Sequence, residues 1–377
     1  MKKGIVVFVI IVVVAGVGWW YMGSTSERAS APVLVVAEET SPNPATPAPL
    51  VEVVAENLTV PWELLFLPDG ELLVTERPGR VLLLRAGIEL VVEDISSKGE
   101  GGLLGAALHP DFASNNWLYL FQTTQDGFGV KNRIVRYVLA DQTLTLERVI
   151  ADDLPGALYH DGGRIAFGPD GYLYAAIGDA LDANAAQNPD SLEGTLLRMT
   201  DGGEPAPGNP FGTLVYSYGH RNAQGITWDE AGNLWSSEHG RSVGGSGFDE
   251  INVIKAGENY GWPESEGDVV VSGTVAPARH STADVTWAPG DLQYLSGSLY
   301  MPGLRGETLY EAVLDDTKII AWHEHFVGEY GRLRTVRVGP DGLLYVLTSN
   351  RDGRGDSPDM TDDRIIRINP LLLERSE

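Results

Sequence analysis

Six short segments of the chain alternate apolar with polar residues, and each follows a turn rich in Asp, Asn or Gly. Asp-Gly and Gly-Asn turns reverse the chain, and period-2 alternation sends one face of the following strand into a core. The pattern therefore predicts six similar β-hairpins. The segments are PDGELLVTE from Pro68, HPDFASNNWLYLFQ from His109, GPDGYLYAAIGD from Gly168, DEAGNLWSSEHG from Asp229, SGSLYMPGL from Ser296 and GPDGLLYVLTSN from Gly339.

The spacing of these hairpins predicts the architecture. They begin about 40 to 70 residues apart, which is room for four strands each. A large β-sandwich would explain the turns but not the number of similar strands. We therefore expect an all-β fold, a six-bladed β-propeller of four-stranded antiparallel blades over residues 51–377, whose radial packing leaves few exposed edges.

The N-terminal segment predicts export. Lys2 and Lys3 precede an apolar run over residues 5–20 that ends in Trp and Tyr, and the length of this run favours a transmembrane helix over a cleaved signal peptide. Residues 23–50 are rich in Ser, Thr, Ala, Glu and Pro and predict a disordered stalk. We expect residues 1–22 to be a membrane anchor or signal peptide. The propeller would then lie outside the cytoplasm, in the periplasm or at the cell surface, or be secreted after cleavage.

Composition narrows the classes of partner and cofactor. A net charge of −25 disfavours nucleic acid and anionic lipid, so a neutral or cationic partner is expected. The chain has no cysteine, which excludes disulfides and thiolate metal sites. The sequence also shows no dinucleotide fingerprint and no strand-to-helix serine elbow, which argues against a nicotinamide enzyme.

Polar residues beside the predicted strands are the candidates for chemistry, because propellers bind ligands on loops over the central channel. His160 precedes the third hairpin and Asp179 follows it. A histidine held by a carboxylate keeps one tautomer and accepts a proton on its other nitrogen. The alternative is a turn histidine bonded to backbone.

Arginines before the predicted strands are candidate anion ligands. Arg221 and Asn222 precede the fourth hairpin, and Arg332 and Arg334 are two residues apart, so on a strand they share a face. Structural arginines or a solvated face explain the same pattern. The segment from Ser237 to Trp262 combines carboxylates with a Gly-rich insertion, the kind of oxygen ligand that calcium takes, without the spacing of a helix-loop-helix site.

Several motifs together resemble the soluble glucose dehydrogenase and aldose sugar dehydrogenase family of quinoproteins, from about Leu58 to Ile368. The motifs are PWELLFLPDGELLVTERPGRV, GEGGLLGAALHPDF, HDGGRIAFGPDGYLYAAIGD, YSYGHRNAQGITWD, DEINVIKAGENYGWP and RLRTVRVGPDGLLYVLT. The resemblance implies a dehydrogenase that oxidises the anomeric hydroxyl of aldose sugars to lactones with pyrroloquinoline quinone and calcium, and that passes electrons to an external acceptor. A homodimer is left open.

The resemblance also implies roles for individual residues. His160 would be the general base, Asp179 the carboxylate that orients it, and Arg221 the group that stabilises negative charge on the quinone during hydride transfer. The resemblance places Asn222, Arg305, Arg332 and Arg334 at the cofactor as well. It places the carbonyls of Gly240 and Arg241 on one calcium, and Glu250 and Tyr260 on a second, structural calcium.

Three residues depart from the family's motifs. Glu100 replaces a glutamine and brings a negative charge toward an anionic cofactor unless a proton or metal neutralises it. Arg241 replaces a proline, and Thr195 replaces a lysine. These departures keep open two alternatives, a cofactor-free propeller that binds a glycan or protein at the cell surface and a calcium-dependent lactonase-like hydrolase.

Overall fold

The computed structural model describes residues 32–35, 48–127, 129–241, 247–355 and 358–375, all within one compact unit. The predicted membrane anchor or signal peptide, residues 1–22, lies outside the described residues. Among the described residues, none belongs to a helix that is long and apolar enough to cross a membrane.

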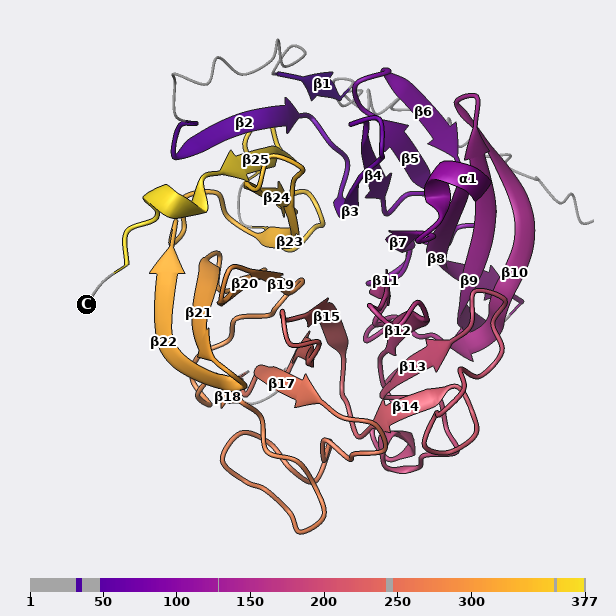
Figure 1. Cartoon of the computed structure of the whole chain (residues 1–377), viewed down its shortest axis with the longest axis vertical. Coiled ribbons are helices and arrows are strands. Elements are labelled where there is room, and N and C mark those ends of the chain that lie inside the picture. The colour runs from indigo at the N-terminus through magenta and orange to yellow at the C-terminus, as the bar shows by residue number, and fades with distance from the viewer. Residues whose placement is uncertain (1–31, 36–47, 128, 242–246, 356–357, 376–377) are drawn as a thin grey trace, which may run out of the picture. The chain divides into compact units, whose positions relative to one another are not determined.

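The described residues form six antiparallel sheets arranged as blades around a centre (Figure 1). Five sheets have four strands in sequence order, and the sixth has five. The predicted six-bladed propeller is therefore confirmed. The innermost strands of blades 1 to 6 are β3 (Pro61–Phe66), β7 (Leu103–Leu108), β11 (Ile165–Phe167), β15 (Ala223–Trp228), β19 (Gln293–Leu295) and β23 (Leu333–Val338).

The six predicted hairpins each contribute the second strand of a blade. Their turns join this strand to the innermost one, so the repeat read from the sequence is the blade repeat itself. The second strands are β4 (Leu72–Glu76), β8 (Trp117–Asp126), β12 (Leu173–Ile177), β16 (Leu234–Glu238), β20 (Ser298–Pro302) and β24 (Leu344–Thr348).

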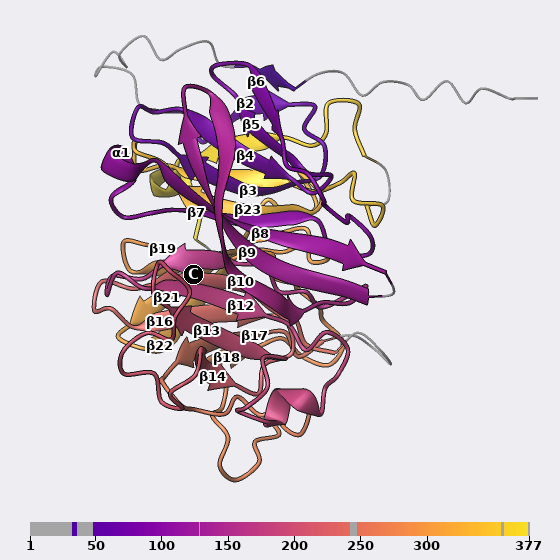
Figure 2. The ribbon, with the colours of Figure 1, turned by 90° about the vertical axis from the view of Figure 1, so that its right-hand side faces the viewer.

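The outer strands complete the blades, and Figure 2 shows the sheets from the side. The third and fourth strands of blades 1 to 5 are β5 (Arg80–Leu83), β6 (Ile88–Val91), β9 (Gly129–Ala140), β10 (Thr143–Pro155), β13 (Thr195–Met199), β14 (Val215–Tyr218), β17 (Glu250–Ile254), β18 (Arg279–His280), β21 (Leu309–Asp315) and β22 (Lys318–His325). Short helices lie at α1 (Phe112–Asn115), η1 (Ala185–Gln187) and η2 (Pro370–Leu372).

The last blade joins the two ends of the propeller. Its third strand, β25 (Ile365–Ile368), pairs with β2 (Val51–Glu56), so that Val51 lies opposite Ile368. β1 (Val33–Leu34), from the segment expected to be a disordered stalk, adds a fifth strand beside β2. An N-terminal strand therefore closes the ring, which leaves no gap between the first and last blades.

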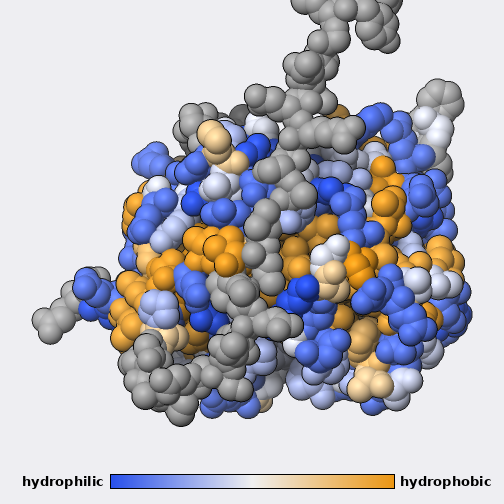
Figure 3. Space-filling model, turned by 90° about the horizontal axis from the view of Figure 1, so that it is seen from above, coloured by the Kyte–Doolittle hydropathy of each residue, from blue (hydrophilic) through white to orange (hydrophobic). Residues whose placement is uncertain are grey.

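Apolar side chains pack between neighbouring blades. One cluster joins Leu104 and Phe121 of blade 2 to Ile177 and Leu197 of blade 3. Further clusters lie between other pairs of blades. Burial of apolar surface between blades holds the ring together. On the face seen in Figure 3, hydrophobic patches lie across the middle, among hydrophilic residues.

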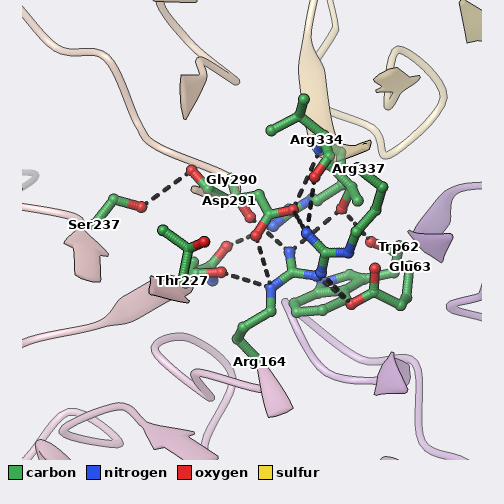
Figure 4. Close-up of polar contacts among 12 residues, drawn as sticks. Trp62, Glu63, Arg164, Thr227, Ser237, Gly290, Asp291, Arg334 and Arg337 are labelled. Atoms are coloured by element: carbon green, nitrogen blue, oxygen red, sulfur yellow. Dashed lines mark hydrogen bonds and ion pairs between the residues drawn. The ribbon is translucent and has the colours of Figure 1, made fainter. Parts of the chain in front are cut away.

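Charged side chains fill the centre of the ring (Figure 4). Arg164 pairs with Glu63 and lies 3.2 Å from Asp291, while Arg337 lies 2.8 Å from Glu63 and also pairs with Asp291. The Arg164 guanidinium lies 4.1 Å from the centre of the Trp62 ring. Two guanidiniums and two carboxylates from four blades balance in charge, which makes their burial tolerable.

Candidate active site

The candidate residues lie at one edge of the blades. His160 precedes β11 and Asp179 follows β12, while Arg221 precedes β15 and Arg332 precedes β23. In an antiparallel hairpin the start of the first strand and the end of the second lie at the same edge. Loops from different blades therefore meet on one face of the ring, over its centre.

His160 is held between two side chains from different loops. Its Nδ1 lies 2.6 Å from Asp179 Oδ1, and its Nε2 lies 2.8 Å from Arg221 Nη2. A guanidinium can only donate, so His160 Nε2 is the acceptor and Nδ1–H donates to Asp179. These partners assign the neutral tautomer with its lone pair on Nε2, the form that a general base requires.

The carboxylate behind His160 is strongly held. Asp179 accepts hydrogen bonds from the Leu181 N–H at 3.0 Å and from Trp262 Nε1 at 2.9 Å. Burial by itself would raise the pKa of Asp179, but the hydrogen bond and charge of His160 and these two donors lower it overall. Asp179 is therefore ionised and orients the His160 ring.

The backbone of His160 is in the left-handed region, with φ of 65°. Its carbonyl approaches Gly178 so closely that a Cβ at residue 178 would lie 1.9 Å from His160 O. Glycine is required at residue 178 for this approach, which places the end of β12 directly beside the histidine.

The negative charge of Glu100, which the sequence analysis left to be offset by a proton or a metal, lies beside an arginine. Arg354 Nη1 lies 2.8 Å from its Oε1, and Oε2 accepts the His160 N–H at 2.9 Å. Burial would raise the pKa of Glu100, but the His160 N–H, the charge of His239 when its ring is protonated, and the charge of Arg354 lower it to about 2. The carboxylate is ionised, and an arginine that the motifs did not reveal neutralises it.

The residues around Arg221 are buried and polar. Arg221 Nη1 donates to His239 O at 3.3 Å, and Asn222 Oδ1 accepts the Gly162 N–H at 3.0 Å. Burial lowers the pKa of His239 to about 4, so its ring is neutral at pH 7, and its Nε2 has no hydrogen-bond partner among the described residues. His239 Nε2 is therefore a buried polar atom that a ligand could bind.

The two arginines of the last blade have different surroundings. Arg332 donates to Ser349 O and Leu304 O at 3.2 and 3.1 Å and to Asp352 Oδ2 at 2.7 Å. Arg334 is buried, bonds through Nη1 to Gln224 Oε1, and has an Nε without a partner in the described part of the chain.

Arg334 is an under-compensated buried cation. Burial is the main cause that lowers its pKa to about 9, and the positive charges of Arg77, Arg332 and Arg164 lower it further, against the opposing charge of Asp352. Arg334 is drawn with the charged residues of the centre in Figure 4, and its guanidinium lies 5.5 Å from the centre of the Trp62 ring. The surroundings of Arg334 therefore favour an anionic ligand.

Two of the remaining candidates take no part in this cluster. Arg305 follows β20 and is exposed. Thr195 is buried at the start of β13, where its hydroxyl donates to Leu192 O at 2.7 Å. The Thr195 hydroxyl therefore stabilises the loop that precedes β13.

The segment around Gly240 is fixed by an aspartate. The Gly240 N–H donates to Asp249 Oδ1 at 2.9 Å, and Arg241 O accepts the Gly247 N–H at 3.3 Å. The Arg241 side chain turns to Glu266, 3.2 Å away. The loop between these residues, 242–246, lies outside the described residues.

Glu250 lies in a buried region with further oxygen atoms, whereas Tyr260 packs in an apolar cluster and its hydroxyl donates to Val253 O at 2.7 Å. Burial raises the pKa of Glu250 to about 8, and the charge of Glu238 adds to this. Asn252 Oδ1 and Glu266 Oε1 are buried without hydrogen-bond partners in the described residues. Unpaired oxygens beside a carboxylate suit a hard cation, although no group of three His, Asp or Glu side chains within the described ranges has metal-ligand geometry.

The sequence did not single out four residues that the structure brings to the site, namely Arg77, His239, Trp262 and Arg354. Trp262 belongs to the motif DEINVIKAGENYGWP, so the sequence did contain a motif that could have pointed to it. Arg354 had none, because it lies 254 positions from its partner Glu100. The site as a whole is a histidine that a carboxylate holds, surrounded by buried cations on a closed propeller, which is typical of the class of sites that transfer a proton beside an anionic ligand.

Comparison with known proteins agrees with this class. The family model described as Glucose / Sorbosone dehydrogenase matches residues 58–366. Aldose sugar dehydrogenase YliI of Escherichia coli (strain K12) is 33% identical over 349 residues, which cover 82% of this chain and 92% of that protein. Quinoprotein glucose dehydrogenase B of Acinetobacter calcoaceticus is 33% identical over 273 residues, which cover 62% of this chain and 56% of that protein.

A solved structure shares both sequence and fold. The PQQ-bound form of aldose sugar dehydrogenase from Streptomyces coelicolor is 43% identical with a TM-score of 0.78, covering 84% of this chain and 97% of that chain. The chain belongs to the glucose/sorbosone dehydrogenase family. The family membership expected from the six motifs is confirmed.

Proposed function

We propose that the protein is a quinoprotein dehydrogenase that oxidises the anomeric C1 hydroxyl of aldose sugars to the lactone with pyrroloquinoline quinone. The observation that carries this proposal is the His160 ring, with Asp179 on Nδ1 and Arg221 on Nε2. The relatives named as aldose sugar dehydrogenase and quinoprotein glucose dehydrogenase support the substrate class and the cofactor.

In the proposed reaction His160 Nε2 accepts the proton of the sugar hydroxyl. Asp179 keeps the proton on Nδ1 in place and stabilises the imidazolium that forms. In the sugar-free structure Arg221 donates to His160 Nε2, so it would have to release this nitrogen when the sugar binds. Its positive charge would then stabilise negative charge on the bound cofactor.

The residues present fit an anionic quinone. Pyrroloquinoline quinone carries carboxylate groups and, when bound, supplies the two-electron acceptor for the hydride that leaves C1. Arg334 has a buried Nε with no partner among the described residues, and His239 has a buried Nε2 in the same condition. We propose that Arg334, Arg332 and Arg221 hold the cofactor together with Asn222. The resemblance to the family adds Arg305, which follows β20, as a further proposed contact of the cofactor.

We further propose two calcium positions. The carbonyls of Gly240 and Arg241 would serve a calcium at the cofactor, and Glu250 and Tyr260 a structural one. The buried oxygens of Asn252 and Glu266 support the second position. Calcium-dependent melting of the protein tests it, because a bound ion would stabilise the folded state by an amount that grows with the logarithm of its concentration over Kd.

The decisive experiment titrates the purified protein with pyrroloquinoline quinone and calcium and then adds glucose and a dye acceptor. Dye reduction that depends on quinone and sugar is expected. Absence of quinone binding would favour a cofactor-free binding protein instead, and lactone hydrolysis that needs calcium but no acceptor would favour a hydrolase.

The proposed location is extracytoplasmic, with residues 1–22 as anchor or signal peptide and an external electron acceptor. The charge pattern of the N-terminal segment supports this proposal. Cell fractionation, with N-terminal sequencing of the mature protein, distinguishes an anchored chain from a cleaved one.

A further inference from the structure

Glu100 of blade 2 contacts both His160 of the neighbouring blade 3 and Arg354 of blade 6. It precedes β7 of blade 2 and accepts the His160 N–H through Oε2 at 2.9 Å. Its Oε1 lies 2.8 Å from Nη1 of Arg354, which stands in the loop after β24 of blade 6. One carboxylate thus serves both the histidine backbone and a guanidinium from across the ring.

Arg354 is placed by its own loop. Its N–H donates to Asp352 Oδ1 at 2.8 Å, and the other oxygen of Asp352 accepts from Arg332 Nη2 at 2.7 Å. The Arg354 guanidinium also lies 5.6 Å from the centre of the Tyr159 ring, directly before His160 in sequence. A continuous set of contacts therefore leads from the arginines of the last blade to the histidine.

The turn that carries Glu100 is fixed by Arg77. Arg77 Nε donates to Gly101 O at 3.1 Å, and its Nη2 donates to Gly99 O at 2.6 Å. A Cβ at Gly102 would lie 2.5 Å from Arg77 O, so the backbone packs tightly there. The Glu100 side chain is thereby aimed at His160.

The negative charge of Glu100 and the positive charge of Arg354 each have a physical role at the site. The left-handed backbone of His160 is unfavourable for a non-glycine residue, and a hydrogen bond to a charged acceptor is stronger than one to a neutral amide. An isolated carboxylate at this place would repel an anionic ligand. Glu100 interacts electrostatically with Arg221 and His239, which places its charge beside the proposed cofactor site.

We propose that Glu100 and Arg354 form one positioning unit for His160, in which the carboxylate holds the histidine backbone and the guanidinium cancels the negative charge that the carboxylate brings to the site. The charge-cancelling half of this inference rests on the proposed function, because it requires an anionic quinone. The backbone-holding half does not.

The first test uses the full-length protein without quinone. Selective ¹⁵N-histidine labelling gives only seven backbone amides, because the chain has seven histidines. In Glu100→Ala, hydrogen exchange of the His160 amide should be more than tenfold faster, whereas Glu100→Gln, whose amide oxygen still accepts, should restore most of the protection. Equal exchange in wild type and Glu100→Ala would overturn the backbone role.

The second test is a charge cycle read by quinone binding. Arg354→Gln should weaken binding about tenfold because it leaves the carboxylate uncompensated, and Arg354→Lys should bind within about threefold of wild type. The double variant Glu100→Gln/Arg354→Gln should recover to within about threefold. In the sugar–dye assay, Arg354→Gln should need about tenfold more quinone than wild type for half-maximal activity.

Controls separate this inference from general damage and from the proposed function. Arg354 is 43% exposed at its side chain, so its variants should fold, and Arg148→Gln removes a similarly exposed arginine far from the site, 4.0 Å from Glu204. If the double variant binds as weakly as Arg354→Gln, the charge-cancelling role is wrong. If wild type binds no quinone, the proposed function is wrong, and the exchange test still decides the role of Glu100.

Discussion

At the scale of single residues, the hydrogen bond from His160 Nδ1 to Asp179 determines which nitrogen can accept a proton. Asp179→Asn places an amide at this position, which can donate to Nδ1 and so favours the wrong tautomer. We expect kcat to fall by about two to four orders of magnitude with little change in quinone affinity. Dye-coupled kinetics and quinone titration measure the two effects.

Asp182 offers a matched control on the same loop. It is exposed and accepts the Ala185 N–H at 3.2 Å, away from His160. Asp182→Asn should keep wild-type kcat. An Asp179→Asn variant with undiminished kcat would contradict the orienting role.

Replacing Arg334 should affect the stability of the protein and its quinone affinity in opposite directions. Because its buried charge is opposed by Arg77, Arg332 and Arg164, Arg334→Met should leave the quinone-free protein as stable as wild type or more stable. Quinone binding should weaken at least tenfold, since a cofactor carboxylate loses its partner. Thermal unfolding without quinone and titration with it measure the two sides, and a variant that loses stability but not affinity would contradict the assignment.

The sequence predicted the meeting of His160 and Asp179 because both flank one recognisable hairpin. The sequence did not predict that Arg332 and Arg334 have different surroundings. The ladder between β23 and β24 shifts register between Leu333 and Thr335. An irregularity of this kind redirects side chains without any sign in the local pattern. The partner of Glu100 was hidden for a different reason, because a contact between distant loops leaves no trace in spacing.

At the scale of elements, Glu311 ties three strands of blade 5 to the C-terminal segment. It accepts from Ser298 of β20 at 2.8 Å and from Arg375 at 2.7 Å, and it lies 3.1 Å from His325 of β22. Burial would raise the pKa of Glu311, but these partners lower it to about 2 from an ordinary 4.5. The carboxylate therefore stabilises the fold above pH 4.5, and this contribution is lost as the pH falls toward 2.

Glu311→Gln should destabilise the protein by about 1–3 kcal/mol at pH 7. The difference from wild type should shrink between pH 4.5 and pH 2, because the wild-type carboxyl is protonated there. Urea unfolding at pH 7 and pH 3 measures this, with the exposed Glu324 of β22 as the control for Glu→Gln exchange. A difference that stays constant with pH would show that ionisation of Glu311 is not the cause.

The second strands of the blades were predicted correctly because a turn and an alternating strand are adjacent in sequence. The outer strands vary in length from β18 (Arg279–His280) to β10 (Thr143–Pro155) and carry no common phrase. β1 arises within a segment whose composition predicts disorder, since Val33 and Leu34 find a partner in β2. Strand formation there depends on the neighbouring sheet and not on local composition.

At the scale of the whole molecule, closure of the ring depends on one N-terminal strand. β2 contributes buried Val54 and Ala55 and covers the edge of β25. A chain that begins at residue 57 should lose on the order of 5 kcal/mol of stability, and its quinone affinity should fall because Arg332 and Arg334 belong to the opened blade. Thermal unfolding and quinone titration measure both.

A chain that begins at residue 48 keeps β2 and should behave as the full-length protein does. Equal melting temperatures for the chains from residue 48 and from residue 57 would show that the strand is dispensable. Local pattern predicted the number of blades but not this closure, because the pairing of residues more than 300 positions apart leaves no local signal.

The pairing of Val51 with Ile368 has a consequence for how the chain can be rewired. These residues face each other across one ladder, so a linker of a few residues could join them and free the ends of the propeller for a new position. Circular permutants that open in the turn at Asp69–Gly70 would make blade 6 covalently continuous and would divide blade 1 between β3 and β4 instead. In such a permutant the order of synthesis changes while the ring stays the same, so the requirement for the N-terminal strand would pass to another blade.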